Sequence, residues 1–189
     1  MVEHFYVKFK LVILAAVRPL LTLDTAKIIA ASIVGSRLDY CNSPLYGLSQ
    51  ANIDRLQRAQ NVLARVVAQA PSIISSADSR RDLHWLPINH RISYKSSLLT
   101  WKALYRPTAE PSYLSELISP YVPARPLRSS NTYLLSIPTA VTSHFSSRSF
   151  SVSAPSTWNS LPQHIRSIDR LSTFKRQLKS HFFQSAFTA

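Results

Sequence analysis

Apolar residues recur at steps of three and four between Leu48 and Pro71, and this spacing constrains the fold more than any other feature of the sequence. Residues three and four apart lie on one face of an α-helix. Ser49 is a suitable N-cap, and the proline at position 71 is typical of a helix end. The segment therefore predicts an amphipathic helix from about Ser49 to Ala70. Its apolar face comprises Ile53, Leu56, Ala59, Gln60, Leu63, Val66 and Val67.

Two more segments have the same helical spacing. Residues 23–38 are expected to form a helix with Asp24 or Thr25 as N-cap and Gly35 at its end. Residues 87–105 are expected to form a third helix with proline at its first position. The serine-rich stretch between the second and third helices predicts a turn.

The C-terminal half begins with a short helix predicted over residues 112–119 and ends with an amphipathic helix capped by Ser172. Its apolar stripe comprises Phe174, Leu178, Phe182 and Phe183, and three cations face away from it: Lys175, Arg176 and Lys179. In between, the phrases "NTYLLSIP" and "SRSFSVSAP" predict two short strands because they combine β-branched, aromatic and serine residues between prolines. The phrase "WNSLP" predicts a turn anchored by a buried Trp158.

These elements predict a mainly α fold. We expect a bundle of three to four amphipathic helices with a small β hairpin or meander and a C-terminal helix that packs back on it. The opening segment has Lys8 and Lys10 before the apolar run Leu11–Val17, which imitates a weak signal sequence. That run is well short of the roughly 20 apolar residues that span a bilayer. We expect a buried helix or strand there and no membrane span.

The formal net charge is +13, which predicts attraction to polyanions. Acidic residues are absent between Leu117 and Ile168, so the excess is not confined to a tail. Nucleic acid, RNA or DNA, is the expected partner class. Basic side chains for phosphate contacts occur with aromatic side chains for base stacking. The candidate binding residues are Arg55, Arg58, Arg65, Arg80, Arg81, Arg91, Lys95, Trp85 and Tyr94.

Catalytic and cofactor sites are not predicted. The chain has two glycines, whereas phosphate-cradling loops need several close together. The aspartates are scattered, so a two-metal centre is not expected, and the histidines lack a zinc spacing. The single cysteine, Cys41, has no evident activating base and cannot form an internal disulfide. We expect no metal, cofactor or small-molecule substrate, and a nuclear or cytoplasmic location rather than secretion.

Six phrases follow one another from about Arg18 to Phe183: "SRLDYCNSPLYGL", "NIDRLQRAQNVLARVV", "RDLHWLPINHRISYKSSLLTWKAL", "PSYLSELISPYVPARPLRSS", "RSFSVSAPSTWNSLPQHIR" and "LSTFKRQLKSHFF". Together they resemble the C-terminal region of the reverse transcriptases of LINE-type, non-LTR retrotransposons of the jockey-like kind. In that family an endonuclease and a polymerase palm precede this region, and the aspartates of the palm carry DNA synthesis. The resemblance transfers no catalytic residue because no palm motif has a counterpart here.

The resemblance implies a division into three parts. Residues 1–17 form a divergent N-terminal segment, and residues 18–111 a helical thumb-like and post-thumb region expected to hold template and primer. Residues 112–189 form a mixed region with short strands and the C-terminal helix. We therefore expect a non-catalytic C-terminal fragment of a retrotransposon reverse transcriptase that binds RNA or DNA through basic helix edges.

The alternative hypothesis is an inert remnant of a mobile element, whose charge is inherited and has no selected partner. Under either hypothesis, an apolar face that once packed against the missing palm would be exposed, and aggregation or pairing of two copies through that face would follow.

Overall fold

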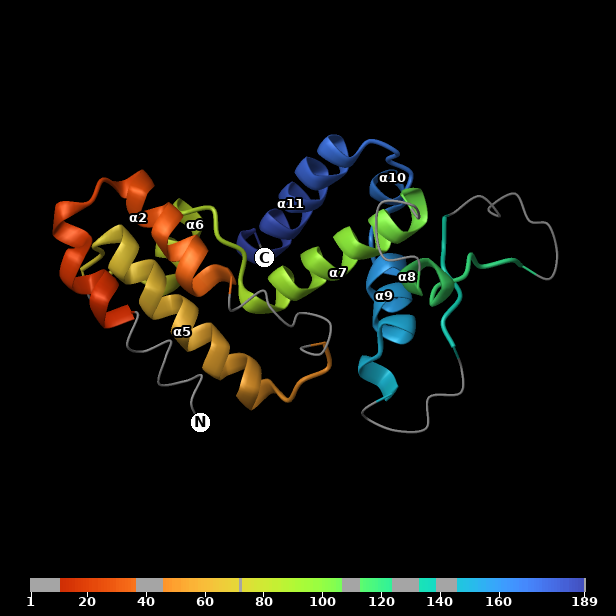
Figure 1. The fold of residues 1–189 in the computed structure, drawn as a ribbon, viewed down its shortest axis with the longest axis horizontal. Helices are drawn as coiled ribbons and strands as arrows, with labels where there is room; N and C mark the ends of the chain where they lie inside the picture. Colours follow the sequence, from red (N-terminus) through yellow and green to blue (C-terminus); the bar gives the residue numbers. More distant parts are fainter. Residues whose placement is uncertain are drawn as a thin grey trace. The chain divides into compact units, whose positions relative to one another are not determined.

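The computed structural model describes residues 11–36, 46–71, 73–106, 113–123, 133–138 and 146–188. Most of these residues are helical, which confirms the predicted mainly α fold (Figure 1). They belong to two compact units. Unit 1 contains the described residues before position 41, Leu48–Arg91 and the C-terminal residues from Ser185. Unit 2 contains Ile92–Gln184 and the short stretch that ends at Gly47.

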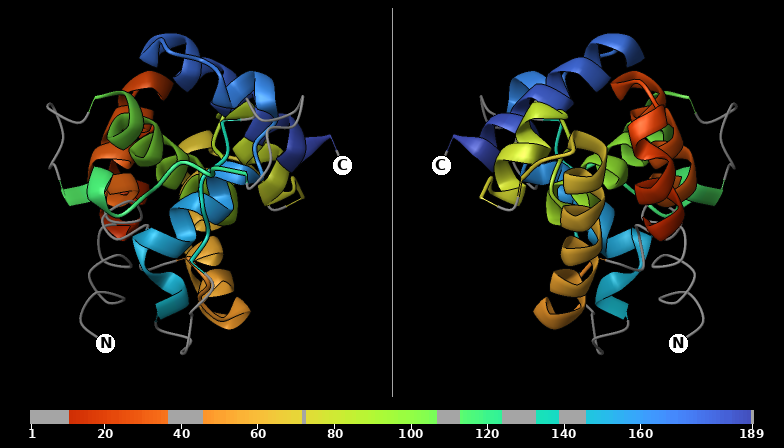
Figure 2. Two further views of the ribbon diagram at one scale, coloured as in Figure 1. Left: turned by 90° about the vertical axis from the view of Figure 1, so that its right-hand side faces the viewer. Right: turned by 90° about the vertical axis from the view of Figure 1, so that its left-hand side faces the viewer.

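Unit 1 is built around α5 (Gln50–Ala68), which packs against α2 (Leu23–Ala30) and α6 (Ser76–Asp82). These helices are orange to yellow-green in Figures 1 and 2. Residues 11–17 are helical too, and they lead through η1 (Arg18–Leu20) into α2. Of the buried helix or strand expected at Leu11–Val17, the helix is therefore found, but only Leu11 and Leu14 are buried and the other residues of the run are exposed.

The limits of α5 agree with the sequence prediction. Ser49 occupies the N-cap position, and Gln69 ends the helix in the left-handed conformation with φ 49°. The N–H of Ala70 donates to the carbonyl of Arg65, and the N–H of Gln69 donates to that of Val66. This pair of bonds is a Schellman motif, which satisfies two carbonyls at the helix end. The predicted apolar face supplies the buried residues Ile53, Gln60, Leu63 and Val67.

Two details of unit 1 differ from the sequence prediction. The N-cap of α2 is Thr22, whose Oγ1 accepts the N–H of Thr25, and not Asp24 or Thr25. The helix also continues past Ala30 through a π-helical turn, η2 (Ala31–Gly35), and remains helical at Ser36, so Gly35 does not end it.

The serine-rich stretch expected to be a turn contains α6. Ser75 caps this helix, because its Oγ accepts the N–H of Asp78 at 3.1 Å and donates to the Asp78 carboxylate at 2.8 Å. A serine three residues before an acid is a capping signal in its own right. The helix was missed because its seven residues, SADSRRD, have no apolar periodicity.

The third predicted helix is α7 (Ile88–Tyr105), which begins directly after Pro87. Its first residues belong to unit 1 and those from Ile92 to unit 2. The other helices described in unit 2 are α8 (Tyr113–Glu116), η3 (Ser146–Arg148), α9 (Phe150–Asn159), α10 (Gln163–Arg166) and α11 (Leu171–Phe187), whose last residues, from Ser185, belong to unit 1.

An aromatic cluster forms the core of unit 2. Phe174 of α11 is fully buried, and its ring lies 5.7 Å from that of Trp101 and 5.9 Å from that of Trp158. Both tryptophans are also buried, and each donates its indole N–H to a backbone carbonyl: Trp101 to Ile168 at 2.7 Å and Trp158 to Tyr133 at 2.8 Å. The rings thus supply apolar burial without leaving their donors unpaired.

The small β hairpin is not present in the described residues. The phrase "SRSFSVSAP" falls largely in α9, a helix that contains Pro155. The other expected strand contributes one isolated antiparallel bridge, between Leu135 and Pro120, and its first residues lie outside the described ranges. Two smaller expectations also change: Trp158 is buried but belongs to α9, and Ser172 lies inside α11, which begins one residue earlier.

Candidate nucleic-acid interface

The arginines of α5 occupy one edge of that helix. Arg55, Arg58 and Arg65 follow one another at steps of three and seven, which places them within a narrow arc. Arg55 and Arg58 are exposed. Arg65 is half-buried and donates from one guanidinium nitrogen to the carbonyl of Ile74 at 3.2 Å. The arginines of this edge that remain exposed, Arg55 and Arg58, therefore lie in the N-terminal half of α5.

A polar network fixes the rotation of α5. Gln60 is fully buried and donates from Nε2 to the carbonyl of Leu86 at 2.8 Å. Gln57 donates to Gln60 at 2.9 Å and to Asn61 at 2.8 Å, and its Oε1 accepts the backbone N–H of Ile88 at 2.9 Å. Because the bonds to Leu86 and Ile88 join α5 to another segment, they fix the rotation of the helix and hold Arg55 and Arg58 at the surface. The sequence predicted the burial of Gln60 but not the network.

The two arginines of α6 are already engaged within unit 1. Arg80 is buried, its guanidinium donates to the Asn61 side-chain oxygen, and burial lowers its pKa. Arg81 is exposed and forms a salt bridge with Asp78 at 3.2 Å. With Asp82 the helix carries as many acids as arginines, so it adds no net positive charge. Arg80 therefore packs within unit 1 against Asn61, and Arg81 is paired with Asp78.

The remaining candidates lie elsewhere. Trp85 is half-buried just after α6, and its backbone N–H donates to the Arg80 carbonyl at 2.8 Å. Arg91 is half-buried, and its guanidinium lies close to Gly35. A Cβ added at Gly35 would be 3.4 Å from one of its nitrogens. Tyr94 and Lys95 are half-buried residues of unit 2, and burial raises the pKa of the Tyr94 phenol. The α5 arginines therefore share one helix edge, whereas the other candidate residues lie on other segments of the chain.

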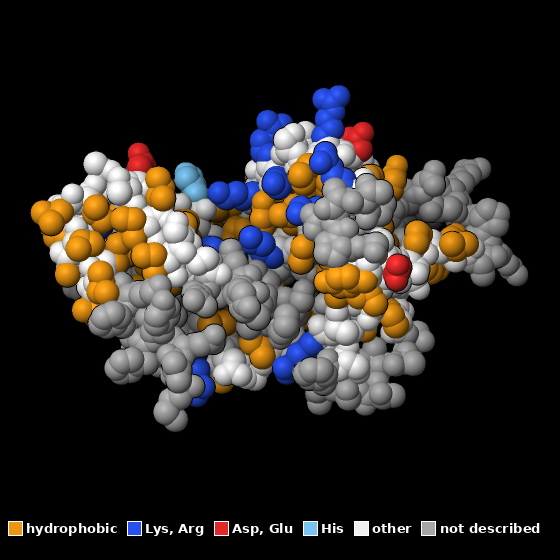
Figure 3. Space-filling view, in the orientation of Figure 1, with side chains coloured by type: hydrophobic (Ala, Val, Ile, Leu, Met, Phe, Trp, Pro, Cys, Tyr) orange, Lys and Arg blue, Asp and Glu red, His pale blue; other side chains and the backbone are white. Residues whose placement is uncertain are grey.

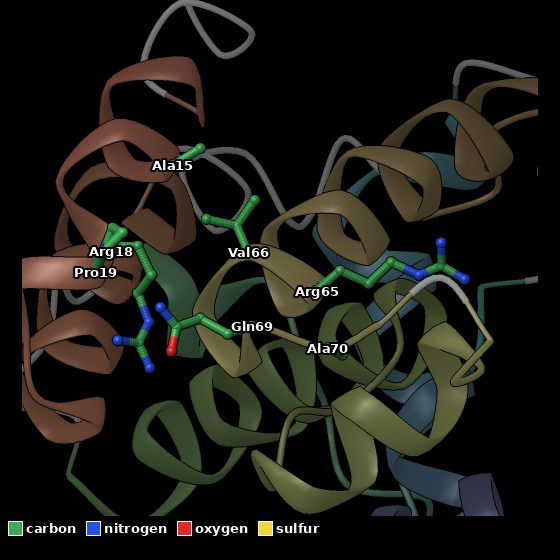
Figure 4. A pocket seen from close by; sticks show the side chains of 7 residues that line it. All are labelled: Ala15, Arg18, Pro19, Arg65, Val66, Gln69 and Ala70. Carbon is green, nitrogen blue, oxygen red and sulfur yellow. The ribbon is translucent and has the colours of Figure 1, made fainter.

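A pocket of about 280 Å³ lies at the C-terminal end of α5 (Figure 4). Arg18 enters it from η1 and is buried, with Nε donating to the Val67 carbonyl at 2.7 Å and NH1 to the Leu21 carbonyl at 2.8 Å. Figure 4 shows the guanidinium of Arg65 pointing away from Arg18. Arg18 thus caps one carbonyl near the end of α5 and one just after η1, a role that no sequence pattern indicated. The pocket is lined by Ala15, Arg18, Pro19, Arg65, Val66, Gln69 and Ala70.

A set of cations on α11 was not among the predicted binding residues. Lys175, Arg176 and Lys179 are all exposed. In Figure 3, lysine and arginine side chains gather over this helix. The signal that identifies them is present in the sequence, since they lie opposite the phenylalanine stripe of a segment without acids.

Two classes of site are not found among the described residues. No group of three or more His, Cys, Asp or Glu side chains there is placed to hold a metal ion. Within the same residues, no helix is both long enough and apolar enough to cross a membrane. No family model, curated protein or solved structure matches the chain.

Proposed function

We propose that this chain is a non-catalytic nucleic-acid-binding region of retrotransposon reverse-transcriptase origin, and that it contacts RNA or DNA phosphates through Arg55 and Arg58. One observation supports this site above the other candidates. The two arginines are exposed one turn apart on α5, whose opposite face is buried, in a chain of net charge +13. Cations held in this way contact successive phosphates without reorganisation of the helix.

The proposed origin is supported by the order of the six phrases that resemble the C-terminal region of jockey-like reverse transcriptases. The second of these phrases, "NIDRLQRAQNVLARVV", forms most of α5. The proposed binding edge therefore belongs to the part of the chain that carries the resemblance.

The acid Asp54 is exposed one turn before Arg58 and accepts a hydrogen bond from Gln50 at 2.8 Å. Its charge opposes that of the arginines where the edge would meet phosphate. Phosphate contacts of this kind are independent of base sequence and weaken as salt increases. The proposed function is therefore general affinity for the nucleic-acid backbone, with no sequence specificity assigned to α5.

The experiment compares two double variants with equal changes in net charge. Arg55→Gln/Arg58→Gln removes the α5 pair, and Lys27→Gln/Arg106→Gln removes two cations outside the proposed site. Binding to a short structured RNA and to a DNA duplex is measured by fluorescence anisotropy. We expect the α5 variant to lose most of its affinity and the control variant to lose little. Equal affinity of the two variants would contradict the site.

The alternative, an inert remnant, is favoured by a different observation. Residues 11–36 expose large apolar side chains, and the exposed fractions are 86% for Leu20, 67% for Val12 and 66% for Ile28. Exposed apolar clusters promote association. On this hypothesis the chain self-associates as its concentration increases, and Leu20→Gln/Ile28→Gln restores a monomer in light scattering. A monomer at all concentrations, with salt-dependent RNA binding, would exclude this alternative.

A further inference from the structure

The helix α11 has one face fixed in the core of unit 2. Phe174 and Leu178 are fully buried, and Phe182, one turn later, is almost so. The ring of Phe174 is held by its contacts with Trp101 and Trp158. The core face therefore sets which side chains of α11 reach solvent.

The outward face of α11 is basic. Lys175, Arg176 and Lys179 span an arc of about 100° and a rise of about 6 Å, given 3.6 residues per turn and 1.5 Å per residue. All three are exposed, and α11 contains no Asp or Glu. Asp169 is exposed just before the helix, followed by the exposed Arg170. Four cations and one acid therefore occupy residues 169–187.

The neighbouring side chains indicate the chemistry of the partner. Ser172 and Ser180 are exposed beside the cations and supply uncharged hydrogen-bond donors. Among the described residues, no large apolar side chain of α11 is exposed. A helix that lies on a membrane needs an apolar face to insert, whereas Phe174, Leu178 and Phe182 of α11 are buried and Phe183 is half-buried. This composition matches a phosphate backbone, which offers charge and acceptors but no apolar surface.

We propose that the outward face of α11, formed by Lys175, Arg176 and Lys179, is a second binding surface for the phosphate backbone of RNA or DNA. It shares the partner class of the proposed function but does not depend on the α5 arginines. Because α5 belongs to unit 1 and this part of α11 to unit 2, the chain then carries one phosphate-binding surface in each unit.

The first test uses the unmodified chain. Lysines are acetylated with N-hydroxysuccinimidyl acetate, with and without a short structured RNA or a DNA duplex, and quantified by mass spectrometry. Protection of Lys175 and Lys179 by either nucleic acid, with Lys27 labelled as before, is the expected result. Unchanged labelling of Lys175 and Lys179 at saturating RNA and DNA would overturn the proposal. The two probes distinguish RNA from DNA as the source of the phosphates.

The second test compares three double variants that each remove two positive charges: Lys175→Gln/Lys179→Gln, Arg55→Gln/Arg58→Gln and Lys27→Gln/Arg106→Gln. For the α11 variant we expect the slope of log affinity against log salt to become shallower by about 2. The Lys27/Arg106 variant should keep the original slope. An α11 variant indistinguishable from this control overturns the α11 surface.

The failures of the two sites are distinguishable. If only the α5 variant loses affinity for nucleic acid, the proposed function stands and the α11 surface is wrong. If only the α11 variant loses affinity, the α11 surface stands and the α5 site is wrong. An equal loss of affinity in all three variants would show a response to net charge only and would contradict both surfaces.

A separate experiment measures binding to vesicles with anionic lipids. Vesicle binding that requires Lys175 and Lys179, together with no RNA or DNA binding, would overturn the phosphate-backbone assignment.

Discussion

Gln57 of α5 accepts a hydrogen bond from the backbone N–H of Ile88, the first residue of α7, with 2.9 Å between the two atoms. The first N–H groups of a helix have no partner within the helix. A side chain from another helix supplies one here, and the same glutamine donates to Gln60 and Asn61. Gln57 thus joins the start of α7 to the polar network that fixes the rotation of α5.

Replacing Gln57 should therefore destabilise the fold. Gln57→Ala leaves the Ile88 N–H and the buried Gln60 side chain with fewer partners, and we expect a loss of about 1–3 kcal/mol in the free energy of unfolding. Urea denaturation followed by circular dichroism measures it. Gln50→Ala on the same helix removes only an exposed bond to Asp54 and should cost within about 0.5 kcal/mol. Equal effects of the two changes would mean that the network does not contribute to stability.

Phe174 should be the most sensitive position of unit 2. Phe174→Ala removes a fully buried ring that contacts Trp101 and Trp158, and we expect about 3–5 kcal/mol of destabilisation. Intrinsic tryptophan fluorescence reports the change directly because both tryptophans lie against the ring. The adjacent exposed residue provides the control, as Lys175→Ala should leave stability nearly unchanged. A small effect at Phe174 would show that this cluster is not the core.

Asp54 should weaken the proposed α5 interface. Asp54→Asn removes a negative charge one turn from Arg58 and keeps the size of the side chain. Exposed charge pairs contribute roughly 0.2–1 kcal/mol, so RNA affinity should increase by a few-fold at most and the gain should vanish at high salt. Titration at two salt concentrations measures both effects. A decrease in affinity would argue that phosphate does not approach this edge.

Acid should destabilise unit 2 through His181. Burial, and secondarily the charge of His164, lower the pKa of His181 from its usual 6.5. The unfolded chain then binds the proton more tightly than the folded chain. The stability that neutral His181 contributes to the folded state is therefore fully present above pH 6.5. It is lost as the pH falls from 6.5 toward the lower folded-state pKa. Denaturant midpoints measured across this range should decrease less in His181→Gln than in the original chain, and identical profiles would refute the assignment.

The parts of the fold that sequence predicts are those where one signal dominates. The α5 segment combines uninterrupted helical spacing with Ser49 and Pro71 at its ends, and its limits agree with the structure. The α9 segment carries opposing signals, because "SFSVSA" alternates and Pro155 removes a helical hydrogen bond. The helix forms nonetheless, with Pro155 and Trp158 buried in unit 2. Tertiary packing outweighs the local pattern there.

In the candidate site too, tertiary packing decides what the local sequence cannot. Arg55 and Arg80 are the same residue type, and each occurs in a polar stretch of sequence. One is exposed and the other is buried against Asn61, a difference that depends on how α6 packs on α5. Spacing predicts which arginines share a helix edge. It does not predict which of them a neighbouring helix covers.

Both proposed surfaces require that the chain binds the phosphate backbone of nucleic acid. The most direct measurement is the affinity of the purified chain for a short structured RNA and for a DNA duplex across a salt series. We expect a linear decrease of log affinity with log salt, with a slope that corresponds to several phosphate contacts and becomes shallower by about 2 in Arg55→Gln/Arg58→Gln. Weak binding with a slope near zero, or a slope that the α5 variant leaves unchanged, would contradict it.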